Sequence, residues 1–258
     1  MLTYKNVNKT SIVLLLVFLL LKVFYSFSLI WICALILIWI ILTTIGSFHI
    51  RWNYFLKANH KNKNIDNHVI SLTFDDGPHK EHTEKVLALL KRYNFKATFF
   101  LIGHKIEAHP NLVEAIINQG HTIGNHTYSH SNNFGFFKTE NVLKELKKTN
   151  QIIEKLQGLK MNLYRPAFGV TNPRISTAIK TLNLIPIGWS VRSLDTTKDT
   201  KEMILTRITK NLQKGDIVLL HDTSQKTVEV LEQLLIFLDK KRWQSISVDQ
   251  LLKIKAYV

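Results

Sequence analysis

The chain has 258 residues and a net charge of +15, which arises from 34 basic and 19 acidic side chains. Charged residues make up 21% of the chain and apolar residues 46%. This balance excludes a disordered protein and suits one domain of roughly 200 residues with an appendage. The single cysteine, Cys33, lies in an apolar N-terminal stretch, which excludes disulfides, Cys-ligated metal and a cysteine nucleophile from the rest of the chain.

The N-terminal segment has the composition of a membrane anchor. Residues 11–46 contain one charged side chain, Lys22, and a bilayer span needs about 20 apolar residues. A break near Tyr25–Ser28 predicts a helical hairpin of two short transmembrane helices, with a single span as the alternative. A signal peptide would end after about 7–15 apolar residues, whereas this run continues past the break. We therefore expect residues 1–48 to anchor the chain in the cytoplasmic membrane, with residues 11–48 in contact with the bilayer.

Residues 49–67 are polar and basic, with Trp52, Tyr54 and Phe55 interleaved, and predict a juxtamembrane linker. From residue 51 onward the chain carries a net charge of +12, which suits an anionic membrane or cell-wall polymer. The bases are dispersed and form no recognisable nucleic-acid module, so we expect no nucleic-acid partner. By the positive-inside rule the basic flank after the apolar run would be cytoplasmic, which conflicts with the outward-facing domain that we expect.

From residue 68 to the C-terminus, short β-rich runs alternate with longer helical patterns. Such alternation predicts βα units around a parallel sheet, and residues 68–258 are too few for a full eight-unit barrel. We expect an incomplete, distorted (β/α) barrel of about seven strands, with a doubly wound sheet as the alternative. The predicted strands are Val69–Phe74, Ala97–Ile102, Thr122–Gly124, Leu163–Tyr164, Ile185–Trp189, Asp216–Leu220 and Ser245–Val248.

The helical patterns lie between these strands and cover residues 81–93, 109–120, 139–157, 172–183, 202–212 and 226–240. Two helix starts are well marked. Pro110 follows His109, and Asn172 precedes Pro173 as the predicted N-cap.

Polar side chains follow several predicted strands, at the ends where chemistry collects in a barrel of this kind. Each is weak evidence alone, because paired aspartates often form a solvated turn and a histidine that ends a buried strand is often a core residue. Their equivalent positions indicate one site. They are Asp75 and Asp76, residues 125–130, Arg165, Asp195, and His221 with Asp222.

The residue types at these positions complement one another. Asp76, His126 and His130 offer a carboxylate and two imidazoles, the thiolate-free ligand set of a catalytic zinc site with an open position for water. Asp75 could accept a proton from that water, and His221 could protonate a leaving group. The set is typical of metal-assisted hydrolysis of an amide or ester.

Four strings in this order and spacing resemble the polysaccharide deacetylase family, carbohydrate esterase family 4, with its chitooligosaccharide deacetylase homology domain. They are TFDDGP (73–78), HTYSH (126–130), RPAFG (165–169) and LLHD (219–222), and the resemblance covers residues 68–255. It implies a distorted barrel and a divalent metal, usually Zn²⁺, with Co²⁺, Ni²⁺ and Mn²⁺ as alternatives. It also implies removal of N-acetyl groups from amino sugars of peptidoglycan or chitin-like chains by what we expect to be a monomer.

The resemblance also implies roles for single residues. Asp75 would be the catalytic base, and Asp76, His126 and His130 the metal ligands. Arg165 would orient the base.

The remaining roles concern the substrate and the leaving group. The backbone N–H of Phe168 would bind the oxyanion, and Leu219 would line the acetyl pocket. His221 would be the general acid, with Asp195 as the partner that tunes it.

The fourth family motif, Asp-x-x-Asp followed by an aromatic, is altered here. Arg192 replaces the first Asp and Thr196 the aromatic, and Ala167 stands where a second proline is common. The change affects the preferred substrate more than the chemistry, and we expect Arg192 to favour substrates that carry negative charge. Two alternatives stay open: a lipid-linked amino sugar as substrate, and a non-catalytic carbohydrate-binding pseudo-enzyme.

Overall fold

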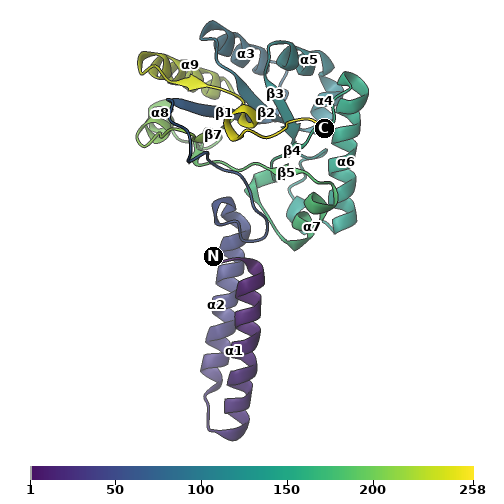
Figure 1. Cartoon of the computed structure of the whole chain (residues 1–258), viewed down its shortest axis with the longest axis vertical. Helices are drawn as coiled ribbons and strands as arrows, with labels where there is room; N and C mark the ends of the chain where they lie inside the picture. The colour runs from purple at the N-terminus through teal and green to yellow at the C-terminus, as the bar shows by residue number, and fades with distance from the viewer. Residues whose placement is uncertain (1) are drawn as a thin grey trace.

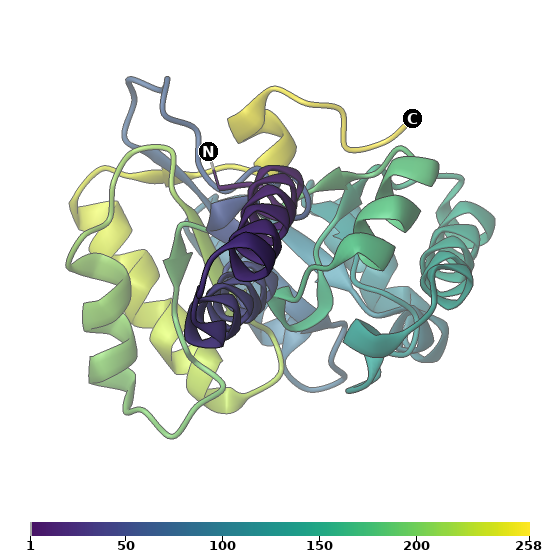
Figure 2. The same cartoon turned by 90° about the horizontal axis from the view of Figure 1, so that it is seen from below.

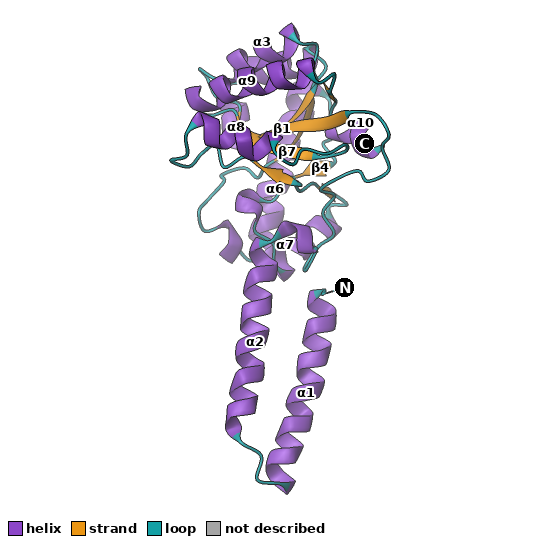
Figure 3. Ribbon diagram, turned by 90° about the vertical axis from the view of Figure 1, so that its left-hand side faces the viewer, coloured by secondary structure: helices purple, strands orange, loops and turns teal. Residues whose placement is uncertain are grey.

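The apolar run folds into a helical hairpin. In the computed structural model, which describes residues 2–258, α1 spans Tyr4–Phe24 and α2 spans Leu29–Phe48. The two helices lie side by side beneath the rest of the chain (Figures 1 and 3). Their connection falls at residues 25–28, as predicted, and the Ser28 hydroxyl caps α2 by accepting from the backbone N–H of Ile30. Both helices are long and apolar enough to cross a bilayer.

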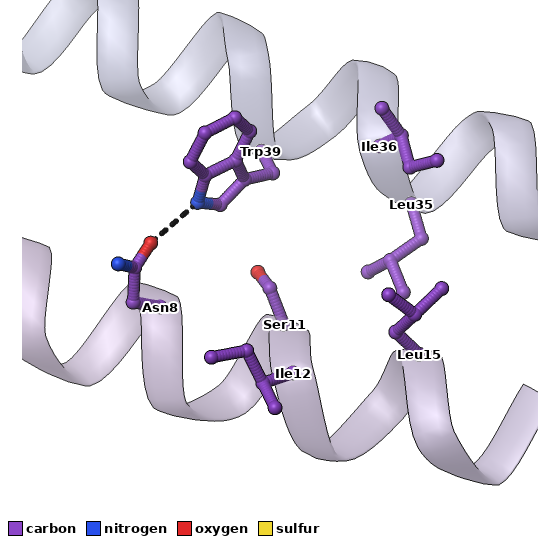
Figure 4. A pocket seen from close by; sticks show the side chains of 7 residues that line it. All are labelled: Asn8, Ser11, Ile12, Leu15, Leu35, Ile36 and Trp39. Carbon is purple, nitrogen blue, oxygen red and sulfur yellow. Dashed lines mark hydrogen bonds between the residues drawn. The ribbon is translucent and has the colours of Figure 1, made fainter.

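A polar contact joins the two helices near the domain. The indole Nε1 of Trp39 donates a hydrogen bond of 2.6 Å to Oδ1 of Asn8 (Figure 4). This bond satisfies two polar groups that would otherwise face hydrocarbon if the hairpin lay in a bilayer. Beside it, both helices line a pocket of about 310 Å³ with the side chains of Asn8, Ser11, Ile12, Leu15, Leu35, Ile36 and Trp39.

The hairpin is bonded directly to the domain. Gly46 of α2 packs so closely on Tyr54 that a Cβ atom would lie 2.4 Å from its ring. The backbone N–H of Thr171 donates to the Ser47 carbonyl at 2.9 Å. Ile50 begins the 3₁₀ turn η1 (Ile50–Trp52) and is buried in the domain core. The second helix therefore enters the domain without a flexible spacer.

The domain is built around a parallel sheet with the order β5-β4-β3-β2-β1-β7-β6, and β8 pairs with the start of β1. Among the described residues no ladder joins β5 to β6, so the barrel stays open on one side. The predicted incomplete (β/α) barrel is therefore confirmed. The strands are β1 Val69–Gly77, β2 Ala97–Leu101, β3 Thr122–Asn125, β4 Leu163–Tyr164, β5 Ile185–Pro186, β6 Val191–Arg192, β7 Ile217–His221 and β8 Gln244–Ser245.

Helices cover the outside of the sheet on both sides of the hairpin (Figure 2). Asn172 caps α7 as predicted, since its side chain accepts from the backbone N–H of Ile175. The helices are α3 Thr83–Arg92, α4 Gly103–Ala108, α5 Pro110–Asn118, α6 Thr139–Gln157, α7 Pro173–Thr181, α8 Lys201–Thr209, α9 Gln225–Lys240 and α10 Val248–Leu252, with 3₁₀ turns η2 Phe134–Phe136 and η3 Ala167–Gly169.

The central strand β1 separates two apolar clusters. Successive side chains of a strand point to opposite faces. Leu72 and Phe74 accordingly join the cluster under the outer helices, whereas Val69 joins the cluster inside the barrel. By the same alternation Thr73 and Asp75 point inward, and this carries the Asp75 carboxylate into the mouth of the barrel.

The structure differs from the predictions at four places. The predicted strand Ile185–Trp189 ends at Pro186, and the sequence does not predict the short strand β6 or helix α4. The predicted strand Ser245–Val248 is wrong beyond Ser245, because Val248 begins α10. Val248 and Leu251 lie at helical spacing and both pack into the inner cluster.

Residues 59–62 occupy the open side of the barrel. Asn59 donates its N–H to the Pro186 carbonyl at 2.9 Å and accepts from the N–H of Gly188 at 2.8 Å. The N–H of Asn62 donates to the Gly215 carbonyl, ahead of β7, at 2.9 Å. Residues 49–67, which we expect to act as a juxtamembrane linker, thus run partly through the packed domain.

Candidate active site

The carboxyl ends of four strands meet at one mouth of the barrel. Asp75 and His221 are register partners on the neighbouring strands β1 and β7. Between β3 and β4, the N–H of Arg165 donates to the Asn125 carbonyl at 3.0 Å, which sets His126 and Arg165 beside each other. The structure therefore brings together residues that lie far apart in the sequence.

Asp76, His126 and His130 converge on one point. Their ligand atoms lie within 4.8 Å of one another, and Nε2 of each histidine is 3.3 Å from Oδ1 of Asp76. The Nδ1 atom of His126 lies 2.9 Å from the Arg165 carbonyl oxygen, which turns Nε2 toward the carboxylate. Asp76 and His130 both have left-handed backbone conformations, with φ of 69° and 48°.

This donor set fits a divalent metal ion. Oδ1 of Asp76 and Nε2 of His130 are buried and have no hydrogen-bond partner within residues 2–258. Buried polar atoms without partners are costly, and a cation among them would satisfy both. One carboxylate and two imidazoles match the nitrogen and oxygen ligands of catalytic zinc sites.

The electrostatics of Asp76 and His130 favour the protonation states that a metal requires. Burial alone would raise the pKa of Asp76, but the imidazole of His126, 3.3 Å away, and the charges of His130 and His221 hold that pKa well below its usual value. Burial, assisted by the charge of His126, lowers the pKa of His130 to about 4. At neutral pH Asp76 is therefore anionic and His130 is a neutral imidazole. For His126, burial alone would lower the pKa, but the charges of Asp75 and Asp76 outweigh burial and raise it.

Asp75 is held by a buried arginine. Nη1 of Arg165 donates to Oδ1 of Asp75 at 2.8 Å and to the Thr73 hydroxyl at 2.6 Å. The other guanidinium nitrogens donate to two backbone carbonyls. Arg165 has no exposed surface and Asp75 is 4% exposed. The pairing aims Oδ2 of Asp75 toward Nε2 of His126, 3.8 Å away.

A second buried carboxylate supports His221. Nδ1 of His221 lies 2.8 Å from Oδ1 of Asp195, and the backbone N–H of His221 donates to Oδ2 at 2.8 Å. Hydroxyl groups of Ser193 and Thr227 donate to the same carboxylate. Burial alone would lower the pKa of His221, but the hydrogen bond and charge of Asp195 outweigh burial and raise it to about 9. His221 is thus protonated at neutral pH. Its Nδ1 is hydrogen-bonded to Asp195, and its Nε2 proton is available for transfer to a leaving group.

The substrate residues expected from the sequence occupy different depths. Leu219 is buried on β7. Phe168 is 46% exposed, and its ring centroid lies 4.4 Å from that of His130. Arg192 is exposed on the edge strand β6, in register with Leu219. The structure therefore places Arg192 at the rim of the site.

Sequence reasoning missed three residues that shape this mouth. The Trp189 ring packs on Gly169, where a Cβ atom would lie 2.5 Å from the indole. Nζ of Lys105 donates to the Asp76 carbonyl at 2.7 Å, and Glu145 accepts from the N–H groups of residues 128 and 129. Lys105 and Glu145 reach the site from helices, where no strand-end pattern could have indicated them.

Known proteins share both the sequence pattern and the fold. The model of the polysaccharide deacetylase family matches residues 62–187. Two proteins of Bacillus cereus, both named peptidoglycan-N-acetylglucosamine deacetylase, are each 36% identical to the chain. One match covers 64% of this chain and 62% of that protein, and the other covers 72% and 89%. The chain therefore spans less than two thirds of the first relative.

A solved structure agrees. The crystal structure of the Bc1960 peptidoglycan N-acetylglucosamine deacetylase is 32% identical, has a TM-score of 0.71, and covers 77% of this chain and 94% of its own. The family match ends before Asp195 and His221. Their place in the site rests on the register of His221 with Asp75 and on the contact between His221 and Asp195.

Proposed function

Because the chain belongs to the polysaccharide deacetylase family, we propose that it is a membrane-anchored, metal-dependent hydrolase that removes N-acetyl groups from amino sugars of peptidoglycan or a chitin-like polysaccharide. The convergence of Asp75, Asp76, His126, His130 and His221 at one mouth carries the proposal. A carbohydrate-binding pseudo-enzyme would have no use for a base and an acid beside a metal site. Peptidoglycan is the first choice of substrate because both Bacillus cereus relatives are named for it.

The chain's own groups can supply each proton transfer. A bound divalent ion, Zn²⁺ in the first place, would polarise the acetyl carbonyl and acidify the attacking water. Asp75, aimed by Arg165, takes the proton of the water as its oxygen bonds to the carbonyl carbon. The backbone N–H of Phe168 would stabilise the resulting oxyanion. As the C–N bond breaks, His221 gives its Nε2 proton to the amine and acetate is released, with Leu219 as the residue that would line the acetyl pocket.

Attachment to the cytoplasmic membrane is proposed from α1 and α2, which are long and apolar enough to span it. We place the domain outside the cell, where peptidoglycan lies. One observation favours a second candidate. The start of α1 lies against residues 51–63, since the N–H of Tyr4 donates to the Tyr54 carbonyl at 2.9 Å. Lys5 and Lys9 are therefore on the side of these basic residues, whereas Lys22, in the last turn of α1, lies nearer the other side. By the positive-inside rule the shared side would be cytoplasmic, which suits a lipid-linked amino sugar as substrate.

A labelling experiment separates these orientations. Cys33 is the single cysteine, so a Cys33→Ser, Lys63→Cys protein carries one thiol outside the hairpin. A membrane-impermeant maleimide should label intact cells if the domain faces outward. Labelling that requires cell lysis would contradict the outward orientation and favour the lipid-linked substrate.

Activity is tested with the full chain in neutral detergent. The metal-loaded protein is incubated with peptidoglycan fragments, chitooligosaccharides and lipid-linked N-acetyl sugars, and acetate release is measured. We expect acetate from at least one substrate and none from the Asp75→Asn variant. The absence of acetate from all three substrates would refute the proposed activity.

A further inference from the structure

A basic hollow lies where the hairpin enters the domain. Two adjoining cavities, of about 130 and about 550 Å³, share Arg51, Ser190 and Arg192 in their walls. Arg51 belongs to η1, directly after the second apolar helix, and Arg192 ends the edge strand β6. The hollow therefore joins the end of the hairpin to the rim of the candidate active site.

Two of the four lysine and arginine side chains that line the hollow are neutralised by acids. Lys61 forms an ion pair with Asp216 at 3.0 Å. Arg207 forms another with Asp199 at 2.5 Å. These two pairs carry little net charge, so the positive charge of the hollow comes from the other two arginines, Arg51 and Arg192.

Arg51 and Arg192 have no carboxylate partner within residues 2–258. Nη1 of Arg51 donates a long hydrogen bond of 3.4 Å to the Ser190 carbonyl. The guanidinium of Arg192 lies 5.8 Å from the centre of the Trp189 ring, a weak cation–π contact. Both side chains are exposed, and both line the smaller cavity. Two guanidinium groups that share a cavity without a counter-charge form a site for an anion.

The position of the hollow indicates what carries the anion. Phe48, the last residue of the second apolar helix, lines the smaller cavity and is 66% exposed. If the hairpin spans a bilayer, the end of this helix marks the level of the headgroups, where lipid phosphates lie. His49 lines the same cavity, and its buried Nδ1 has no hydrogen-bond partner among the described residues. This nitrogen provides a third polar contact.

We propose that the hollow between Arg51 and Arg192 binds the phosphate group of a lipid. The guanidinium fork is suited to phosphate oxygens, and the proposal rests on the membrane attachment proposed above. The bound phosphate would lie beside the catalytic mouth, since Trp189 stands between Arg192 and Arg165, each 5.8 Å from its ring. Two sources share this chemistry: a bilayer phospholipid, and the phosphate that links an amino sugar to its lipid.

Native mass spectrometry of the full chain in neutral detergent tests the proposal. The probes are phosphatidylglycerol, farnesyl diphosphate, the phosphate-free alcohol farnesol, and inorganic phosphate. The test protein is a double variant that carries both Arg51→Gln and Arg192→Gln. The control is Lys241→Gln, which removes one exposed base at the C-terminal end of α9. We expect the wild type and the control to bind at least one lipid phosphate, and the double variant to bind it at least about tenfold more weakly. Tighter binding of phosphatidylglycerol or of farnesyl diphosphate identifies the source.

Undiminished affinity of the double variant for both lipid phosphates would overturn the site. So would binding of farnesol as tight as that of farnesyl diphosphate, or of inorganic phosphate as tight as that of either lipid. An unchanged melting temperature of the double variant establishes that a loss of binding is not a loss of fold. Because the assay measures no turnover, its outcome is independent of the acetate-release assay that tests the proposed activity.

Discussion

Replacing Asp195 by Asn should shift the alkaline limb of the pH–rate profile to lower pH. Asp195 accepts from both Nδ1 and the backbone N–H of His221 and is the main cause that raises the pKa of His221, from 6.5 to about 9. At about 1.4 kcal/mol per pH unit, this shift corresponds to ~3 kcal/mol that favours protonated His221. Smaller contributions from Asp75 and Asp76 remain in the variant, so we expect the limb to move by about one to two pH units.

The assay is kcat for acetate release between pH 5 and 10, with the metal-loaded full chain in detergent. Asp199→Asn is the matched control, because it removes a carboxylate from the same loop that pairs with Arg207 and not with His221. An alkaline limb at the same pH in wild type and Asp195→Asn would refute the assignment of His221 as the general acid tuned by Asp195.

The same pair predicts how stability depends on pH. The pKa of His221 is raised in the folded state, so its contribution is fully present below about pH 6.5 and is lost as pH rises toward 9. The difference in unfolding free energy between wild type and Asp195→Asn should therefore be largest near pH 6 and shrink toward pH 9. Urea unfolding at several pH values measures it, and a difference that grows with pH would contradict the raised pKa.

Four further substitutions test the site. His126→Ala and His130→Ala should each lower metal affinity at least about tenfold, since three protein ligands become two; near-stoichiometric metal in both variants after dialysis would contradict the ligand set. Asp75→Asn should abolish acetate release and retain the metal, because an amide cannot accept the proton, and near-normal turnover would rule out Asp75 as the base. Arg165→Met should destabilise the fold by ~3–5 kcal/mol, because it leaves the Asp75 charge buried without its partner; a variant that melts at the wild-type temperature would argue against that pair.

Long, periodic elements could be predicted from the sequence, and short ones could not. Helix α6 spans Thr139–Gln157, the predicted range, because an apolar stripe runs along its 19 residues and Gly158 ends it with a φ of 67°. Strand β6 has two residues and α4 has six, too few for a period to be recognised. In residues 49–67, Leu56 and Ala58 lie in a stretch that mixes polar and apolar residues without a regular period, and only tertiary packing shows that they are buried.

For the site, the sequence predicted which strand ends hold the candidate catalytic side chains, but it did not predict which other residues surround them. Asp76, His126 and His130 follow strands whose order along the chain is also their order in the sheet, so their convergence could be expected. Trp189 and Lys105 reach the mouth through a bend after β5 and through α4, neither of which the sequence predicts. A residue whose role depends on packing between elements far apart in the sequence leaves no local sequence pattern from which that role could be predicted.

If the hairpin spans a bilayer, an enzyme attached this rigidly cannot search the depth of a cell wall. Gly46 and Ser47 of the second apolar helix are in direct contact with the domain, and η1 follows that helix after His49. A catalytic unit on a long flexible stalk would sample a thick layer of polymer, whereas the mouth of this barrel would stay at one height above the bilayer. If the enzyme faces outward, it can deacetylate a glycan strand only while that strand lies at this height. The time since a strand was inserted would then decide which of its sugars lose their acetyl groups.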